Sequence, residues 1–420
     1  MNNSVYIKRK TNDNFKLNNV FITVLLVFYV LWRMPIVSYY VNTYVAMMAL
    51  VSLTVLVAFY DTKYFTKTPS VIVALIPFLL LTIGDQYLMG IQTSNSALNV
   101  IWLIFLDIMP VFVGCLIIYN EMDFAIKVLV PTIIASHVIT GFTTYLGLLR
   151  FPEASRIMAT GGTHFERYYV YNIGGFAFVY ALVLLHPLFV GYFKLRNKYI
   201  LSILTTAITG FCVFESAYTT AALLFILSCV AYFLPTKDGK KMNKTRVALI
   251  VAFLVVVLIM LPAFLEALSE WEPLERSSEK LKDLAGMLQG KETEGQALES
   301  RQEVYQKSWE IFKSSPIIGF GLFGEKTGGH SYFLDTLAKW GLIGFTVIIV
   351  FFLSFFNEYK RLSNGSFVYY YALLFFVLLI ILCGLNPKIW LYQLGFVVPL
   401  FLYHMENKTP VESSKEYTVL

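Results

Sequence analysis

The chain has 420 residues, of which 57% are hydrophobic and 14% charged, and its formal net charge is +6. A soluble globular protein carries roughly a quarter of charged residues, so this composition excludes a soluble domain and indicates a polytopic membrane protein. The basic residues are spread over short segments between apolar runs, so the positive charge does not indicate binding of nucleic acid. The four cysteines lie inside apolar runs and form neither a disulfide framework nor a metal-ligand spacing.

Twelve apolar runs approach the length that crosses a bilayer, about 20 residues. They predict an all-α bundle of about twelve transmembrane spans, nine before one large loop and three after it. The runs begin near Val20, Thr43, Ser70, Ala97 and Ile126 and continue with 172–193, 199–213, 217–234, 246–263, 332–356, 366–384 and 389–404. Only Glu215 and Ser216 interrupt the stretch 199–234, which we interpret as two short helices.

The distribution of lysine and arginine predicts the orientation of these spans. With the N-terminus inside, 19 of the 33 basic residues fall in cytoplasmic segments, and the external side is nearly bare outside the large loop. Both termini are therefore predicted to be cytoplasmic, in a protein of the cytoplasmic (inner) membrane. The predicted parts are a bundle at 1–263 with an external loop at 150–171, a large external loop at 264–330, three spans at 331–404 and a cytoplasmic tail at 405–420.

The large external loop is expected to contain amphipathic helices. In its first part, Leu281, Leu284, Met287 and Leu288 suggest a helix on or near the membrane surface. In its second part, a guanidinium and three aromatic residues recur at three- and four-residue spacing, which predicts one face of a helix ending near Ser314. These residues are Arg301, Tyr305, Trp309 and Phe312. The loop carries twelve acidic and eight basic residues, so Arg301 does not belong to a general cationic patch.

A proline and several glycines then break the chain before the next span. They are Pro316, Gly319, Gly321, Gly324, Gly328 and Gly329. This pattern predicts a tightly turning segment that brings His330 to the mouth of the span.

These residues resemble the hallmark of the O-antigen ligase and polymerase family of bacterial membrane glycosyltransferases. In that hallmark, an arginine is followed by an aromatic residue, a proline and two glycines, then by a histidine, a small polar residue and a leucine-rich span with two glycines. Here the pattern is formed by Arg301, Tyr305, Pro316, Gly319, Gly321, His330, Ser331, Leu334, Leu337, Gly341 and Gly344. Ser331 stands where many members of the family have asparagine.

The resemblance implies transfer of a glycan from a polyprenyl diphosphate to a sugar hydroxyl. The diphosphate leaving group must be stabilised by metal ions or by fixed cations. The chain has no Asp-x-Asp and no trusted cluster of external acids, so we expect no metal and no cofactor, and arginines for this role. The candidates are Arg301, Arg150, Arg156 and Arg167. Except for Arg301, for which function is favoured, binding to lipid headgroups or pairing with Glu153 or Glu166 explains them equally well.

The attacking hydroxyl needs a group that accepts its proton or orients it. His330 is the candidate, because histidine accepts a proton near neutral pH and this one stands at the start of a span. His164 in the other external loop is the rival base. Glu215 is either a base or a solvated turn residue, and Tyr305 is expected to contact substrate. Asp107 lies within a span and must face a partner or a water-lined cavity.

The leading hypothesis is a polymerase of surface polysaccharide, O-antigen or capsule, which joins polyprenyl-diphosphate-linked repeat units on the outer face of the membrane. The alternative within the same family is a ligase that passes finished glycan to a terminal acceptor. From another class, a flippase of lipid-linked oligosaccharides would also have twelve spans, but the chain has no internal repeat. The expected partners are the lipid-linked glycans, membrane lipid and, by family analogy, a protein that regulates chain length.

Overall fold

The computed structural model of the chain describes residues 14–60, 70–93, 104–160, 164–235, 244–271, 278, 282, 285–286, 296–320, 327–364 and 366–407. These residues are almost entirely helical, and no strand occurs among them. The prediction of an all-α protein is therefore confirmed. The predicted surface helix at Leu281, Leu284, Met287 and Leu288 falls on residues outside the described ones, as do Gly321, Gly324 and most of the tail at 405–420.

The helices follow the apolar runs of the sequence. The first half of the chain forms α1 (Asn14–Trp32), α2 (Pro35–Tyr40), α3 (Thr43–Tyr60), α4 (Ser70–Thr93), the π-helix η2 (Ile104–Ile108) continued by α6 (Met109–Tyr119), α7 (Asp123–Arg150), α8 (Ala154–Thr160), α9 (Arg167–Val170) and α10 (Phe176–Leu195). The second half forms α11 (Tyr199–Glu215), α12 (Thr219–Ser228) continued by the 3-10 helix η3 (Cys229–Phe233), α13 (Lys244–Glu270), α15 (Gln296–Ser314), α16 (Tyr332–Leu362), α17 (Val368–Leu385), and the π-helix η6 (Gln393–Val397) continued by α18 (Val398–Glu406).

Among the described residues, four helices are long and apolar enough to cross a membrane: α7, α10, α16 and α17. Shorter apolar helices stand at other predicted spans, including those of α1, α4 and α6. An apolar helix suits a bilayer because it satisfies its own backbone hydrogen bonds where no water is present. Each of the twelve predicted runs contains helix, and among the described residues ten of the runs contain an apolar helix of this kind, four long and six shorter. Twelve crossings are not confirmed by this.

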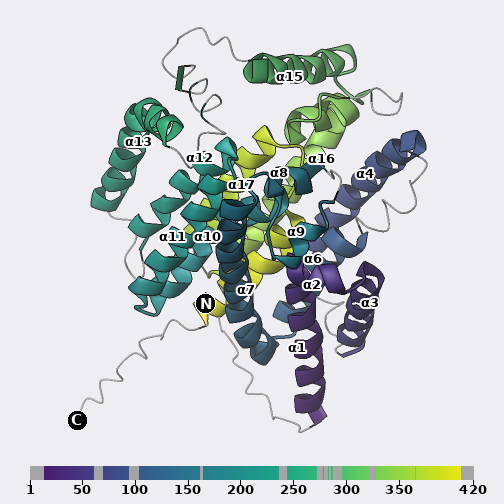
Figure 1. Ribbon diagram of the computed structural model, residues 1–420. Coiled ribbons are helices and arrows are strands. Elements are labelled where there is room, and N and C mark those ends of the chain that lie inside the picture. Colours follow the sequence, from purple (N-terminus) through teal and green to yellow (C-terminus); the bar gives the residue numbers. More distant parts are fainter. Residues whose placement is uncertain are drawn as a thin grey trace.

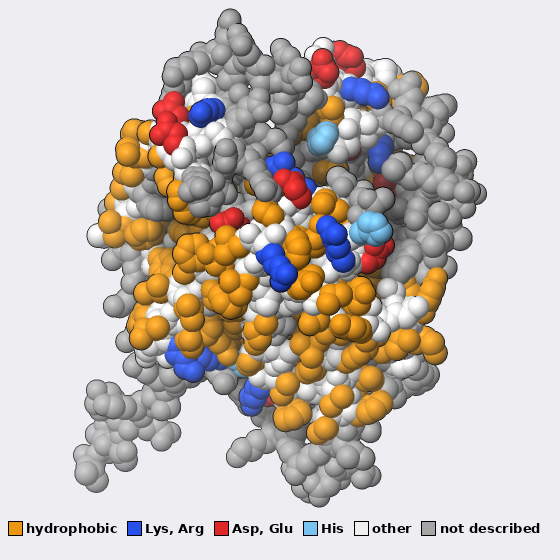
Figure 2. Space-filling model, viewed as in Figure 1, with side chains coloured by type: hydrophobic (Ala, Val, Ile, Leu, Met, Phe, Trp, Pro, Cys, Tyr) orange, Lys and Arg blue, Asp and Glu red, His pale blue; other side chains and the backbone are white. Residues whose placement is uncertain are grey.

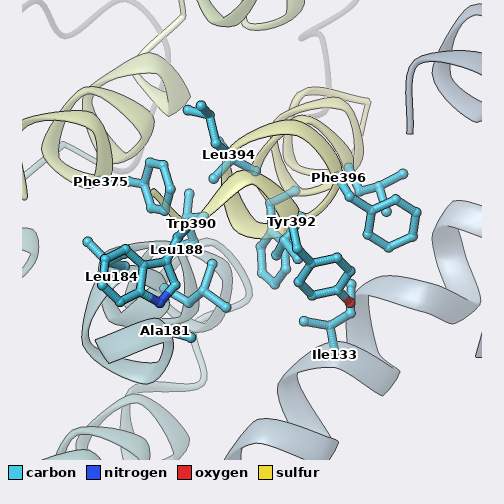
Figure 3. Close-up of a cluster of buried hydrophobic side chains, with 14 of the residues drawn as sticks. Ile133, Ala181, Leu184, Leu188, Phe375, Trp390, Tyr392, Leu394 and Phe396 are labelled. Atoms are coloured by element: carbon cyan, nitrogen blue, oxygen red, sulfur yellow. The ribbon is translucent and has the colours of Figure 1, made fainter. Parts of the chain in front are cut away.

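The core of the bundle is built around α10 and the segment that runs from Trp390 through η6 into α18. The middle and the end of α10 are buried from Val179 to Lys194, because helices surround it (Figure 1). Figure 3 shows Ala181, Leu184 and Leu188 of α10 beside Trp390, with Phe375 of α17 above them. Trp390 is also fixed by a hydrogen bond, since its indole nitrogen donates to the carbonyl oxygen of Ala177 at 3.2 Å.

Polar contacts between helix ends agree with the predicted alternation of the spans. Ends that the prediction assigns to the cytoplasm are joined by hydrogen bonds between Tyr119 and Glu358, Lys194 and Tyr232, and Arg196 and His404. Ends assigned to the outer face are joined by Tyr218 and Ser155, Trp390 and Ala177, Tyr332 and Asn386, and the ion pair of Lys339 with Asp85. These contacts require α11 and α12 to be two antiparallel helices, which confirms that interpretation of the stretch 199–234.

Charged side chains gather toward one end of the bundle on the face shown in Figure 2. Lysine, arginine, histidine and acidic side chains lie in the upper part of that view, around α8, α9, α15 and α16, and a broad hydrophobic surface lies below them. We name the end that carries α8, α9, α15 and the start of α16 the polar end. Which side of the membrane it faces stays a prediction.

Two glycines of the motif allow the segment after α15 to pack directly against α16. Both have positive φ, 73° at Gly319 and 59° at Gly341, and Gly341 kinks α16. Three backbone hydrogen bonds cross there: from Phe320 to Ala338 at 2.9 Å, from Leu342 to Pro316 at 2.8 Å and from Ile343 to Ile317 at 3.2 Å. A Cβ on either glycine would collide with backbone atoms of the facing segment. The glycine pair therefore fixes how α15 is joined to α16.

Replacing Gly341 by alanine is expected to lower the free energy of unfolding by more than about 1 kcal/mol, because both the positive φ and the facing carbonyl of Ile317 oppose a Cβ. Gly384 is the matched control, since it lies in α17 with no atom within 4 Å of its Cβ position. Thermal unfolding of the purified variants tests this. Equal melting temperatures for Gly341→Ala and the wild-type protein would contradict the prediction.

Candidate functional site

A polar network at the polar end surrounds the carboxylate of Asp335, in the first turn of α16. This carboxylate is buried, and its Oδ1 accepts hydrogen bonds from the Ser308 hydroxyl at 2.8 Å and from the Gly329 amide at 3.2 Å. Its Oδ2 accepts one from the Ser331 amide at 3.3 Å, and the Ser308 hydroxyl oxygen accepts one from the Gly328 amide at 2.9 Å. One acid thus joins α15, the glycine segment and α16.

His330 stands between the two amides that Asp335 binds. Its side chain is exposed, while its neighbour Ser331 is 2% exposed and caps α16 by accepting a hydrogen bond from the Leu334 amide at 3.3 Å. The backbone is therefore held on both sides of His330, and the imidazole remains free to meet a ligand. Ser331 therefore has a structural role, as the cap of α16.

The backbone of Arg301 lies close to this histidine. In α15, Arg301 is three residues before Val304, a rise of about 4.5 Å along a helix. The backbone of Val304 packs so closely on Gly328 that a Cβ there would collide with it. The segments that carry Arg301 and His330 therefore meet at the polar end. Arg301 lies about one turn of α15 away from the contact between Val304 and Gly328. The side chain of Arg301 lies outside the described residues, and the Tyr305 side chain is half-buried.

The face of α15 predicted from the spacing of Arg301 and the aromatic residues coincides only partly with the face that packs against the rest of the chain. The helix ends at Ser314, as expected, and the rings of Trp309 and Phe312 contact each other with centres 5.2 Å apart. The residues buried against the rest of the chain are Ser308 and Ile311, whereas Trp309 is 46% exposed. The aromatic residues of the motif thus lie beside the packed face, toward the surface.

A chain of contacts leads from His330 to Arg156. The amide of Tyr332 donates to the carbonyl oxygen of Asn386 at 2.9 Å, and four residues later Trp390 packs on Tyr180, which in turn packs on Tyr218. Tyr218 donates to the carbonyl oxygen of Ser155 at 2.8 Å and interacts electrostatically with the half-buried Arg156. Arg156 and His330 therefore belong to one connected end of the bundle.

Arg150 and Arg167 are held by aromatic rings of their own segment, 150–171. The Arg150 guanidinium lies 5.4 Å from the ring centre of Phe151 and 6.0 Å from that of Tyr171. Arg167 lies 4.8 Å from the ring centre of Tyr168 and donates to its hydroxyl oxygen at 2.7 Å. Both side chains are exposed, so each presents its charge at the surface with the ring behind it.

Two further candidates lie near these arginines. His164 is exposed and has a positive φ of 63°, and Glu215 is half-buried at the last residue of α11, three residues before Tyr218. In the segment 150–171, burial and the nearby Glu166 carboxylate raise the pKa of Tyr169, so this phenol stays protonated and can donate a hydrogen bond. The roles assigned to these residues stay predictions.

Sequence reasoning missed Asp335 and Ser308, which hold the histidine segment. The only local signal was an acid in the first turn of a helix that follows a glycine-rich segment. No group of three or more histidine, cysteine, aspartate or glutamate side chains suited to a common metal ion occurs among the described residues. What this end offers chemically is a set of cations, an exposed imidazole and phenol hydroxyls.

In a comparison with known protein families, residues 204–349 match the family described as O-antigen ligase. The matched part includes Glu215, Arg301, Tyr305, His330 and Asp335, and it begins after the segment that carries Arg150 and Arg156. No curated protein matches the chain.

Replacing Asp335 by asparagine is expected to release the segment that carries His330. Asparagine keeps one acceptor oxygen and places an amide group against donors, and hydrogen bonds to a charged group are worth about 1.5–3 kcal/mol. Hydrogen exchange at the amides of Gly329 and Ser331 should therefore become at least about tenfold faster. Asp85→Asn, which removes the ion pair with Lys339, is the matched control. Unchanged exchange at both amides in Asp335→Asn would show that the carboxylate does not hold this segment.

Proposed function

We propose, from the premise that the chain belongs to the O-antigen ligase and polymerase family, that it is a polymerase of bacterial surface polysaccharide. In this proposal the enzyme joins polyprenyl-diphosphate-linked repeat units at the outer face of the cytoplasmic membrane. The single observation that carries the proposal is the junction around Asp335, which holds the segment of His330 against the middle of α15. This junction supports the proposal because the segments that carry Arg301 and His330 meet there.

In the proposed reaction, a sugar hydroxyl of the acceptor attacks the anomeric carbon of the donor glycan. The bond between that carbon and the diphosphate oxygen breaks, and its electron pair leaves with the polyprenyl diphosphate. The proton of the hydroxyl passes to the imidazole of His330. Arg301, assisted by Arg150 or Arg156, binds the diphosphate and stabilises the charge that develops on it. This displacement assigns no step to a metal ion.

Several observations support this division of roles. The His330 side chain is exposed while its backbone is fixed, which suits a base that must meet an incoming hydroxyl. Arg156 stands beside the packed tyrosine pair of Tyr218 and Tyr180, at the same end as His330. Aromatic rings and phenol hydroxyls of this kind pack on sugar rings and donate hydrogen bonds to them.

Arg301→Ala and His330→Ala are each expected to abolish polymer, with a loss of at least about a hundredfold, as is typical when a general base is removed. Polymer is measured on gels of surface glycan, and the amount of folded protein is measured in isolated membranes. Lys360→Ala is the control, because it removes an exposed cation at the opposite end of α16. Full-length polymer made by both variants would contradict the proposal.

A ligase of the same family is the second candidate, and the description of the matched family favours it. The glycans that accumulate in a deletion strain separate the two functions. Loss of a polymerase leaves single repeat units on the carrier or the final acceptor, and this is the expected result. Long polymer retained on the carrier lipid would instead identify a ligase, and mass spectrometry of extracted lipids distinguishes the two patterns.

A further inference from the structure

A second polar cluster lies inside the helix bundle, near the polar end. It consists of Arg33, which follows α1, Asp107 in the π-helix η2, and Tyr392, which directly precedes the π-helix η6. The segment after Arg33 is tied to the external segment of α8 and α9, because the amide of Ile36 donates to the side-chain oxygen of Asn172 at 3.3 Å. None of the roles assigned above uses this cluster.

The cluster has hydrogen-bonding capacity that the protein does not use. The Tyr392 side chain is 1% exposed, and its hydroxyl has no hydrogen-bond partner among the described residues. Among the residues that the structure describes, none forms a hydrogen bond to the half-buried carboxylate of Asp107. The electrostatic partners of this carboxylate are Arg33 and Lys388. A polar or charged group enclosed by helices is costly unless it is hydrogen-bonded. Both groups are therefore available to a ligand.

Arg33 is oriented by the groups around it. One of its guanidinium nitrogens donates to the carbonyl oxygen of Leu106 at 3.2 Å, and the guanidinium lies 4.7 Å from the ring centre of Tyr392. The ring of Tyr29 packs edge-on against Tyr392, with centres 6.0 Å apart. A guanidinium has five N–H donors, so most of its capacity remains for an anion such as a phosphate.

Local backbone geometry helps to form the cluster. Asp107 lies within one π-helix and Tyr392 adjoins another, and single-turn π-helices are frequent at functional sites. The two π-containing segments pack on each other, since the Cβ position of Gly114 in α6 meets the backbone of Gly395 and Phe396 in η6. Irregular helix turns at membrane depth are tolerated where they are buried in protein or line a polar cavity.

The cluster is joined to the site of His330 by one short piece of chain. The carbonyl oxygen of Asn386 accepts the hydrogen bond from Tyr332, two residues after His330, and Tyr392 follows six residues later. Six residues span at most about 20 Å. Lys388 lies between these two points and acts electrostatically on Asp107. The glycan of one substrate bound at the cluster can therefore extend toward the base.

We propose that Arg33, Asp107 and Tyr392 form the acceptor subsite, which binds the diphosphate and first sugar of a second polyprenyl-linked glycan. Arg33 and Lys388 bind the diphosphate, Asp107 accepts hydrogen bonds from sugar hydroxyls, and the Tyr392 hydroxyl donates one. This inference rests on the proposed function, since a polymerase must hold two lipid-linked glycans at once. It assigns the donor to Arg301 and the acceptor to Arg33.

The test counts the lipid-linked glycans bound to each chain. The probe is the polyprenyl-diphosphate-linked repeat unit extracted from a deletion strain, and the protein is the full chain carrying His330→Ala, which prevents turnover. Native mass spectrometry is expected to detect two copies per chain. Adding Asp107→Asn or Arg33→Gln should weaken binding of one copy at least tenfold and leave one copy bound. Adding Asp123→Asn, at the opposite end beside Tyr403, should leave two.

Two copies bound to both the Asp107→Asn and Arg33→Gln proteins would overturn the acceptor subsite. Binding of at most one copy to the His330→Ala protein would also overturn the acceptor subsite, because only one glycan site would then exist. This holds whether or not the added substitutions abolish binding of that copy. No binding of the probe at all by the His330→Ala protein would contradict the proposed function itself, and the subsite would fall with it. Adding Arg301→Ala should remove the other copy, which separates the two sites.

Discussion

The hydrogen bonds of the buried Asp335 carboxylate are the interactions on which the rest of the polar end depends. This carboxylate binds the hydroxyl of Ser308 from α15 and the amides of Gly329 and Ser331 on either side of His330. Without it, the Ser308 hydroxyl and the Ser331 amide would lose their acceptor in a buried position, where an unsatisfied group costs about 1–3 kcal/mol. A single acid therefore links the helix of Arg301 to the segment of His330 and to the first turn of α16.

Near this junction the bundle contains two polar sites, one exposed and one enclosed by helices. The segment from Asn386 to Tyr392 runs between them, with the exposed histidine segment at one end and the enclosed Arg33 cluster at the other. A transferase that joins two lipid-linked molecules needs this kind of arrangement, in which two anionic headgroups are held apart while a hydroxyl of one glycan reaches the anomeric carbon of the other. The long helix α15 lies beside α16 at the polar end (Figure 1).

Local patterns in the sequence predicted local features well. The end of α15 at Ser314, the break before Tyr332 and the separate helices α11 and α12 all follow from spacing, proline, glycine and apolar length. The functional groupings were not accessible in this way, because they join distant segments. Arg33 and Tyr392 are far apart in sequence, and the pairing of Gly319 with Gly341 exists only once the helices have packed. Periodicity along one helix contains no information about such contacts.

The central claim is that the diphosphate of the donor lies between α15 and the segment of His330. Photo-crosslinking tests it most directly, with a polyprenyl diphosphate that carries a photoreactive group next to the phosphates and peptide mass spectrometry to locate the label. The account predicts label in both 296–314 and 327–335. Label confined to the ends of helices at the opposite end of the bundle, near Glu358 and His404, would contradict it.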